Sequence, residues 1–270
     1  MSGPRQRERH WLRALADSDD AHTTLVCLPY AGGTPRIYDG WLPHLPDGVR
    51  LLAADLPGHG FLRGDEAVCD DLAYVTGRLC AELPAPERAG RLVLFGYSLG
   101  GCLAHALAHA WRERWGRAPY ALAVAALDAP WAPRALPYFA GLPADELWSR
   151  VGAFGAIPEP LLAHRELAPL LVRALRADIA MAEGYQPKAP PLECRVSVFG
   201  WSGDPLTTRP GLAAWSAEAA PGAHREHLYA DPPGGHFFAE RDPGPVVAAL
   251  FADLATPAPA RPLRPTSSTV

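Results

Sequence analysis

The chain has 270 residues, 49% of them hydrophobic, which suits one α/β domain of generous size better than two small ones. Its formal net charge of −4 and the lack of phosphate-binding or dinucleotide-binding glycine patterns argue against nucleic-acid and nucleotide binding. Its apolar runs are too short to cross a bilayer, there is no apolar signal segment, and the five scattered cysteines lack metal-ligand spacing, so we expect a cytoplasmic protein with reduced cysteines, no metal and no membrane partner.

Strands and helices are predicted to alternate in the first third of the chain. Residues 1–22 are polar and are expected to form an N-terminal arm, either frayed or a short helix. The apolar run 23–28 predicts the first strand, which leads into the loop Pro29-Tyr30-Ala31-Gly32-Gly33. His59, in a later turn-rich loop, is expected to fix that loop by a hydrogen bond rather than act as a base. The other elements predicted here are a helix over 37–45, a strand over 49–54 and an amphipathic helix over 69–83.

The central motif of the chain lies in the stretch RLVLFGYSLGGCL, residues 91–103. An apolar run predicts a strand, Gly96-Tyr97-Ser98-Leu99-Gly100 matches G-x-S-x-G, and a helix is expected from Gly101 to about Arg114. Strand, sharp turn and helix are the context in which this motif presents a strained, exposed nucleophilic serine, and the glycines are then a steric requirement. The alternative is an ordinary glycine-serine turn that caps a helix; the flanking strand and helix favour the nucleophile.

The helix after the motif carries His105 and His109, one turn apart. This spacing can hold zinc, but the segment HALAH lacks the glutamate of H-E-x-x-H, and no third ligand lies nearby in the sequence. We therefore expect these histidines to be solvated or to cap the helix.

The alternation of strands and helices breaks after a strand predicted over 120–127. Residues 134–185 contain no convincing strand, only two amphipathic helical stretches over 144–154 and 159–183. An all-helical insertion between strands of a doubly wound sheet suggests a lid, whose apolar faces either pack on one another or form a chamber above Ser98; both can hold together. The remaining elements are strands over 194–199 and 225–229, a helix over 242–254 and a Pro-rich disordered tail over 255–270.

A serine hydroxyl needs a base within hydrogen-bond reach, and the base needs an acid to orient it. In this architecture the chain order is serine, acid, histidine, and His236, in a glycine-flanked loop after the last strand, fits the base. Two acids follow predicted strands: Asp204, in a Gly-x-Asp-Pro turn, and Asp128. Loops at the carboxyl ends of parallel strands face the same crevice, so either carboxylate could reach His236.

With these motifs in place, the chain resembles the type II thioesterases that accompany polyketide synthases and nonribosomal peptide synthetases. The resemblance spans about residues 23–240 and implies an α/β-hydrolase fold, with a mostly parallel, doubly wound sheet over 23–254 and a helical lid over 134–185. It implies Ser98 as nucleophile, His236 as base, Asp204 as acid, and an oxyanion hole from the N–H groups of Ala31 and Leu99. The stretches that carry it are residues 28–33, 55–58, 96–100, 170–178 and 235–238.

Two features of the chain depart from that family's usual pattern. Tyr97 stands where the family often has histidine, and Leu99-Gly100-Gly101 replaces Met-Gly-Ala. Both resemble the thioesterase domains fused to synthases, which commonly place the acid after the earlier strand, as in Leu127-Asp128-Ala129-Pro130. Asp128 therefore remains the alternative acid, and we favour Asp204 because the rest of the chain matches the free-standing family.

The resemblance implies a monomeric serine hydrolase that releases acyl or aminoacyl groups from the phosphopantetheine arm of acyl or peptidyl carrier protein domains. The protein would need no cofactor of its own, since the substrate carries the phosphopantetheine. The alternatives are a thioesterase dedicated to product release, a small-ester carboxylesterase, and a non-catalytic binding protein with the same fold. Intact Ser98 and His236 argue against the last of these.

Overall fold

A computed structural model describes residues 10–60, 68–134, 136–155 and 168–256. A seven-stranded sheet with the strand order β1-β3-β2-β4-β5-β6-β7 runs through the molecule. β1 is antiparallel to β3, and every other neighbouring pair is parallel, which confirms the predicted doubly wound α/β-hydrolase architecture. The strands are β1 Leu12–Ala16, β2 Thr23–Leu28, β3 Val49–Ala54, β4 Arg91–Tyr97, β5 Ala121–Ala125, β6 Cys194–Trp201 and β7 Ala219–Tyr229.

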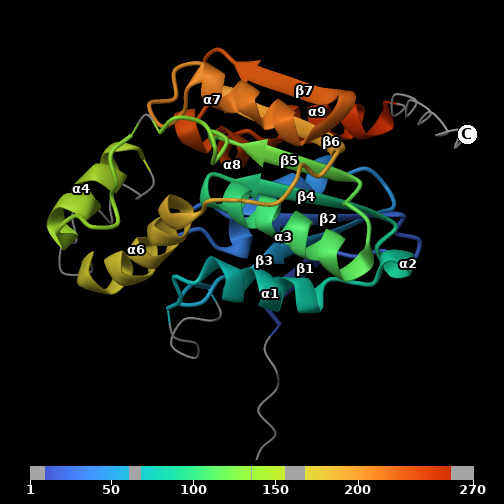
Figure 1. The fold of residues 1–270 in the computed structure, drawn as a ribbon, viewed down its shortest axis with the longest axis horizontal. Helices are drawn as coiled ribbons and strands as arrows, with labels where there is room; N and C mark the ends of the chain where they lie inside the picture. The colour runs from blue at the N-terminus through green and yellow to red at the C-terminus, as the bar shows by residue number, and fades with distance from the viewer. Residues whose placement is uncertain (1–9, 61–67, 135, 156–167, 257–270) are drawn as a thin grey trace, which may run out of the picture.

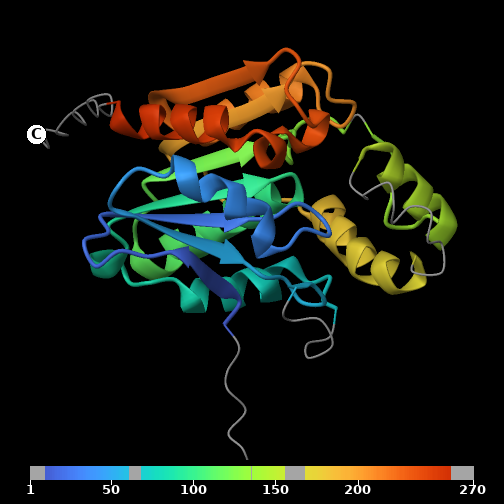
Figure 2. The same cartoon turned by 180° about the vertical axis from the view of Figure 1, so that it is seen from behind.

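Two apolar layers sandwich the sheet, because its central strands are buried on both faces. Along β4, Leu92 and Leu94 belong to one core cluster, whereas Val93 and Phe95 belong to the other. This is the two-residue alternation of a strand between two helical layers. Figures 1 and 2, drawn from opposite sides, show α1 and α3 in front of one face and α9 in front of the other.

The helices divide between these layers and the lid. The first face is covered by α1 Leu72–Glu82, α3 Leu99–Trp115, α7 Arg209–Ala213 and the 3-10 helix η4 Ala214–Glu218. The second face is covered by the 3-10 helix η1 Pro35–His44, α8 Phe238–Arg241 and α9 Pro243–Ala255. The short α2 Pro86–Ala89 precedes β4, and the 3-10 helix η5 Gly235–Phe237 precedes α8. No helix among the described residues is long and apolar enough to cross a membrane.

The expectation of a frayed or helical N-terminal arm is wrong for Leu12–Ala16, which form the edge strand β1. Trp11 is fully buried, and the backbone N–H groups of Trp11 and Leu12 donate to the carboxylate of Glu82. The pairing partner and the anchoring carboxylate both lie far along the chain, so the local polar composition gave no sign of a strand.

The predicted helical insertion contains α4 Ala144–Ala153 and α6 Ala168–Gly184, which pack on one another through a small core of their own. Figure 1 shows both helices beside the end of the sheet toward which the parallel strands point. Part of the second predicted helix, residues 159–167, and most of the predicted tail, residues 257–270, lie outside the described residues. The lid is thus anchored at the edge where an α/β sheet carries its active site.

Candidate active site

Ser98 lies at the turn between β4 and α3, and its backbone is strained. Its φ of 52° falls in the left-handed region that residues with a Cβ rarely adopt. The Ser98 N–H donates to the carbonyl of Ala125 at 2.8 Å, and the Gly101 N–H donates to the Ser98 carbonyl at 2.7 Å. A Cβ on Gly96 would overlap the carbonyl of Gly100, which confirms the predicted steric requirement for glycine.

The loop after β2 lies against the first turn of α3. A Cβ on Gly100 would overlap the carbonyl oxygen of Leu28, so the glycine allows this close approach. Ala31 and Leu99, the residues expected to form the oxyanion hole, line the same cavity as Ser98. Their role as backbone donors to the oxyanion stays a prediction.

His236, at η5 after β7, is hydrogen-bonded to Asp204 in the loop after β6. Nδ1 of His236 lies 2.7 Å from Oδ2 of Asp204, and both side chains are buried. The other carboxylate oxygen of Asp204 accepts the backbone N–H of Leu206 at 2.9 Å. The predicted contact between Asp204 and His236 is confirmed. Because the carboxylate accepts, Nδ1 carries a proton and Nε2 is left to receive one.

The alternative acid, Asp128, has a different partner. Its carboxylate accepts the backbone N–H of Thr208 at 2.9 Å and the Thr208 hydroxyl at 2.8 Å. Thr208 caps α7, since its Oγ1 accepts the N–H of Gly211. Burial raises the pKa of Asp128, although the bonds from Thr208 oppose this shift. Asp128 therefore fixes the loop that follows Asp204 and is not bonded to His236.

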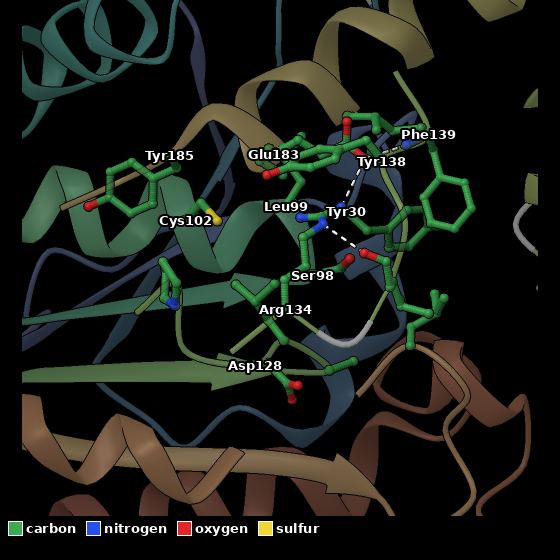
Figure 3. A pocket seen from close by; sticks show the side chains of 18 of the residues that line it. Tyr30, Ser98, Leu99, Cys102, Asp128, Arg134, Tyr138, Phe139, Glu183 and Tyr185 are labelled. Carbon is green, nitrogen blue, oxygen red and sulfur yellow. Dashed lines mark hydrogen bonds and ion pairs between the residues drawn. The ribbon is translucent and has the colours of Figure 1, made fainter. Parts of the chain in front are cut away.

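A cavity of about 380 Å³ lies between the sheet edge and the lid, and both Ser98 and His236 line it. In Figure 3, Tyr185 and Cys102 lie to one side of Ser98, and Tyr138 and Phe139 lie to the other. The lid contributes apolar side chains from both helices, namely Val151, Leu175 and Ile179. The cavity is thus a mainly apolar chamber above a strained serine, with room for a small acyl group.

Comparison with known proteins agrees with this geometry. A family model described as thioesterase domain matches residues 23–253. The chain belongs to the thioesterase family. It is 29% identical to the gramicidin S biosynthesis protein GrsT of Aneurinibacillus migulanus, over 81% of this chain and 83% of that protein. It is 28% identical to the thioesterase PikA5 of Streptomyces venezuelae, over 84% and 79% of the two chains.

Solved structures of thioesterases share the fold. The RedJ thioesterase of the prodiginine pathway of Streptomyces coelicolor superimposes with a TM-score of 0.77 at 29% identity, over 86% of this chain and 91% of that one. The type II thioesterase BorB of the borrelidin cluster gives a TM-score of 0.76 at 27% identity, over 90% and 97% of the two chains. The expected resemblance to type II thioesterases is confirmed.

Tyr97 positions the histidine loop of this thioesterase, a role that the sequence did not reveal. Its hydroxyl donates to the backbone carbonyl of His236 at 2.6 Å and accepts the N–H of Ala239 at 3.3 Å. The residue before the nucleophile therefore holds both η5, which contains His236, and the first turn of α8. The signal in the sequence was the tyrosine itself, at a position where the family often has histidine.

Asp178 connects the lid to the sheet edge of the thioesterase. From α6, its Oδ2 accepts the backbone N–H of Gly32 at 2.8 Å and lies 2.9 Å from Nε2 of His59. His59 and Asp178 are both buried. The expectation that His59 fixes its loop fits this contact, but the partner lies on the lid, which local sequence could not indicate.

The expectation that His105 and His109 are solvated or capping is wrong. Both are buried inside the thioesterase, and Glu218, from η4, lies beside them. Oε1 of Glu218 lies 3.1 Å from Nε2 of His105. The third group was missed because it comes more than a hundred residues later in the chain, and only the packing of η4 on α3 brings it close.

Proposed function

We propose that this thioesterase hydrolyses acyl and aminoacyl thioesters carried on the phosphopantetheine arm of carrier protein domains, as an editing enzyme of a polyketide or nonribosomal peptide synthase. The relatives that support this assignment are named for the biosynthesis of such products, gramicidin S and borrelidin among them. The observation that carries the chemistry is the 2.7 Å hydrogen bond between Asp204 and His236. His236 lines the same cavity as Ser98.

In the proposed mechanism, Nε2 of His236 takes the proton of Ser98 as Oγ attacks the thioester carbonyl carbon. Asp204 holds the imidazole in the tautomer with Nδ1 protonated and stabilises the positive charge that forms. The N–H groups of Ala31 and Leu99 would donate to the oxyanion. The thiolate leaves and takes the proton from His236. Water then attacks the acyl-serine with the same base, and the free acid and Ser98 are restored.

The site suits a substrate that arrives on a long arm. The cavity is roofed by the lid and its lining is largely apolar, so it can hold the acyl group away from water. The phosphopantetheine arm would span the distance from the carrier surface to Ser98. The substrate supplies this group, so the proposal requires no resident cofactor, and it places the enzyme in the cytoplasm, acting as a monomer.

The proposal is tested by measuring hydrolysis of a panel of acylated carrier proteins. The same enzyme is assayed in parallel on an aryl ester and on a free acyl thioester such as acyl-N-acetylcysteamine. We expect carrier-bound substrates to be hydrolysed with the highest kcat/KM, and Ser98→Ala to abolish both turnover and labelling by a fluorophosphonate. Preference for the aryl ester would indicate a carboxylesterase. Activity on only one carrier-bound product would indicate product release, and no labelling of a folded protein would indicate a binding protein.

A further inference from the structure

Three buried ligand-type side chains converge behind the catalytic cavity. His105 and His109 lie one turn apart on α3, and Glu218 ends η4 on the neighbouring part of the same face. They are 0%, 7% and 5% exposed, and one ligand atom from each lies within 4.8 Å of the other two. The aromatic ring of Trp215 lies 5.6 Å from the His105 ring and helps to enclose the cluster.

The spacing of these atoms suits a tetrahedral cation. Nε2 of His105 lies 3.1 Å from Nε2 of His109 and 3.1 Å from Oε1 of Glu218. Nε2 of His109 lies 3.9 Å from Oε2 of Glu218. With metal–ligand bonds of about 2.0–2.1 Å, neighbouring ligands around zinc are about 3.3 Å apart. The two 3.1 Å separations match this value. The 3.9 Å separation involves the other oxygen of the Glu218 carboxylate, so the three side chains can surround one ion after a small shift of that carboxylate.

With both histidines neutral and Arg112 in place, no pair of tautomers turns every close contact of the cluster into a hydrogen bond. Nδ1 of His109 lies 3.1 Å from a guanidinium nitrogen of Arg112, which can only donate, so a neutral His109 carries its proton on Nε2. That N–H points at Nε2 of His105. If His105 accepts it, no proton lies between His105 and the carboxylate of Glu218. If His105 is instead protonated at Nε2, two N–H groups face each other. Either tautomer leaves one close contact repulsive.

A divalent cation removes this conflict, because all three atoms would then present lone pairs to one positive centre. The outer contacts are those of a metal site. Nδ1 of His105 is hydrogen-bonded to the hydroxyl of Tyr185 at 2.6 Å, and Oε2 of Glu218 accepts the N–H of Leu192 at 2.8 Å. Ligating histidines and carboxylates in proteins are oriented by second hydrogen bonds of this kind.

One contact must change when the ion binds. His109 would then carry its proton on Nδ1, facing Arg112. The guanidinium also donates to the carbonyls of Pro190 and Pro191, at 2.8 and 2.6 Å, so it keeps two acceptors if it turns away from the ring. Because Arg112 covers the outer side of His109, the same movement would open a path for the ion.

We propose that His105, His109 and Glu218 form a binding site for Zn²⁺ or a similar divalent transition-metal ion. Two imidazoles and one carboxylate match the ligand preference of zinc and cobalt rather than of magnesium or calcium. The ion would tie α3, which carries Ser98 at its start, to η4. It would also fix His105 against Tyr185, which lines the catalytic cavity. The site is structural, because its ligands are buried away from Ser98.

The site is tested by treating the protein with a chelator and then titrating the metal-free protein with Zn²⁺ or Co²⁺ at neutral pH. We expect one Zn²⁺ per chain by calorimetry and a tetrahedral Co²⁺ absorption band that Zn²⁺ displaces. At a hundredfold excess of free Zn²⁺ over Kd, Tm should rise by roughly 5–10 °C. Glu218→Gln and His109→Gln should lose the band and the rise in Tm, whereas His44→Gln, an exposed control, should keep both.

A second readout does not depend on the variants folding. The ring of Trp131 lies 5.5 Å from the ring of His105, so bound Co²⁺ should quench tryptophan emission in the wild-type protein. Absence of Zn²⁺ binding and of Co²⁺ quenching in the folded wild type would overturn the proposal. Equal binding by wild type and Glu218→Gln would overturn it as well, because the ion would then occupy another site.

Discussion

The carboxylate of Asp178, on lid helix α6, accepts the backbone N–H of Gly32 at 2.8 Å. Gly32 directly follows Ala31, a proposed oxyanion donor, and has a φ of 83°, which suits a glycine in a tight turn. The same carboxylate oxygen lies 2.9 Å from Nε2 of His59. The position of the lid and the conformation of the loop that contains Ala31 are therefore linked through one buried side chain.

Removal of the Asp178 carboxylate should lower kcat more than it changes KM. Loss of a complete oxyanion donor costs about 10²–10³ in kcat, and a donor that is misplaced costs part of this. We expect Asp178→Ala to lower kcat roughly 10- to 100-fold. Asp178→Asn, which keeps an acceptor for Gly32, should lose less. Asp145→Asn, an exposed acid on α4, is the matched control. Steady-state kinetics on a small thioester measure these effects. If Asp178→Ala changed KM alone, the proposed link between the lid and the loop that contains Ala31 would be contradicted.

Tyr97→Phe should weaken both stability and catalysis. The change leaves the buried carbonyl of His236 without its 2.6 Å donor, which typically costs about 1–3 kcal/mol. Because that carbonyl belongs to the base itself, we expect kcat to fall about tenfold as the histidine loop loses its fixed position. Urea unfolding and kinetics measure the two effects. Tyr120→Phe, whose hydroxyl bonds the Leu254 carbonyl far from the site, should lower stability without lowering kcat.

Cys102 should be inert although it lies one turn beyond Ser98 and lines the cavity. Burial raises the pKa of its thiol from 9.0 to about 12. A raised thiol pKa means that the reactive thiolate is scarcer at any pH below that value, so little is present at pH 8. We expect iodoacetamide to modify the half-buried Cys69 and to leave Cys102 and the activity intact, as judged by mass spectrometry. Rapid inactivation that Cys102→Ser prevents would show a reactive thiol.

All five cysteines are free, in agreement with the reduced state expected from their scattered positions.

What the sequence predicted well was local: the apolar runs of β2 to β6, and the strand, turn and helix around Ser98. What it missed depends on distant partners. β1 pairs with β3 and is anchored by Glu82, both far along the chain, and η4 lies beside His105. Tyr97 and Asp178 bond groups far along the chain, so no spacing rule identifies them.

The assignment of the triad acid can be decided by two matched substitutions. Asp204 is bonded to His236 at 2.7 Å, whereas Asp128 binds the backbone N–H and hydroxyl of Thr208. Asp204→Asn presents an amide to Nδ1 and favours the wrong imidazole tautomer, which costs about 10⁴-fold in kcat in serine proteases. We therefore expect Asp204→Asn to lose nearly all activity on carrier-bound and small thioesters, with little change in KM.

Asp128→Asn should act on stability instead. Its amide oxygen can still accept from Thr208, so we expect kcat to fall less than tenfold, with a loss of stability of about 1 kcal/mol from the weakened cap of α7. Kinetics and urea unfolding on both variants separate the two effects. If Asp128→Asn lost activity as severely as Asp204→Asn at unchanged stability, Asp128 would share the orientation of His236, and the acid of this thioesterase would be a pair rather than Asp204 alone.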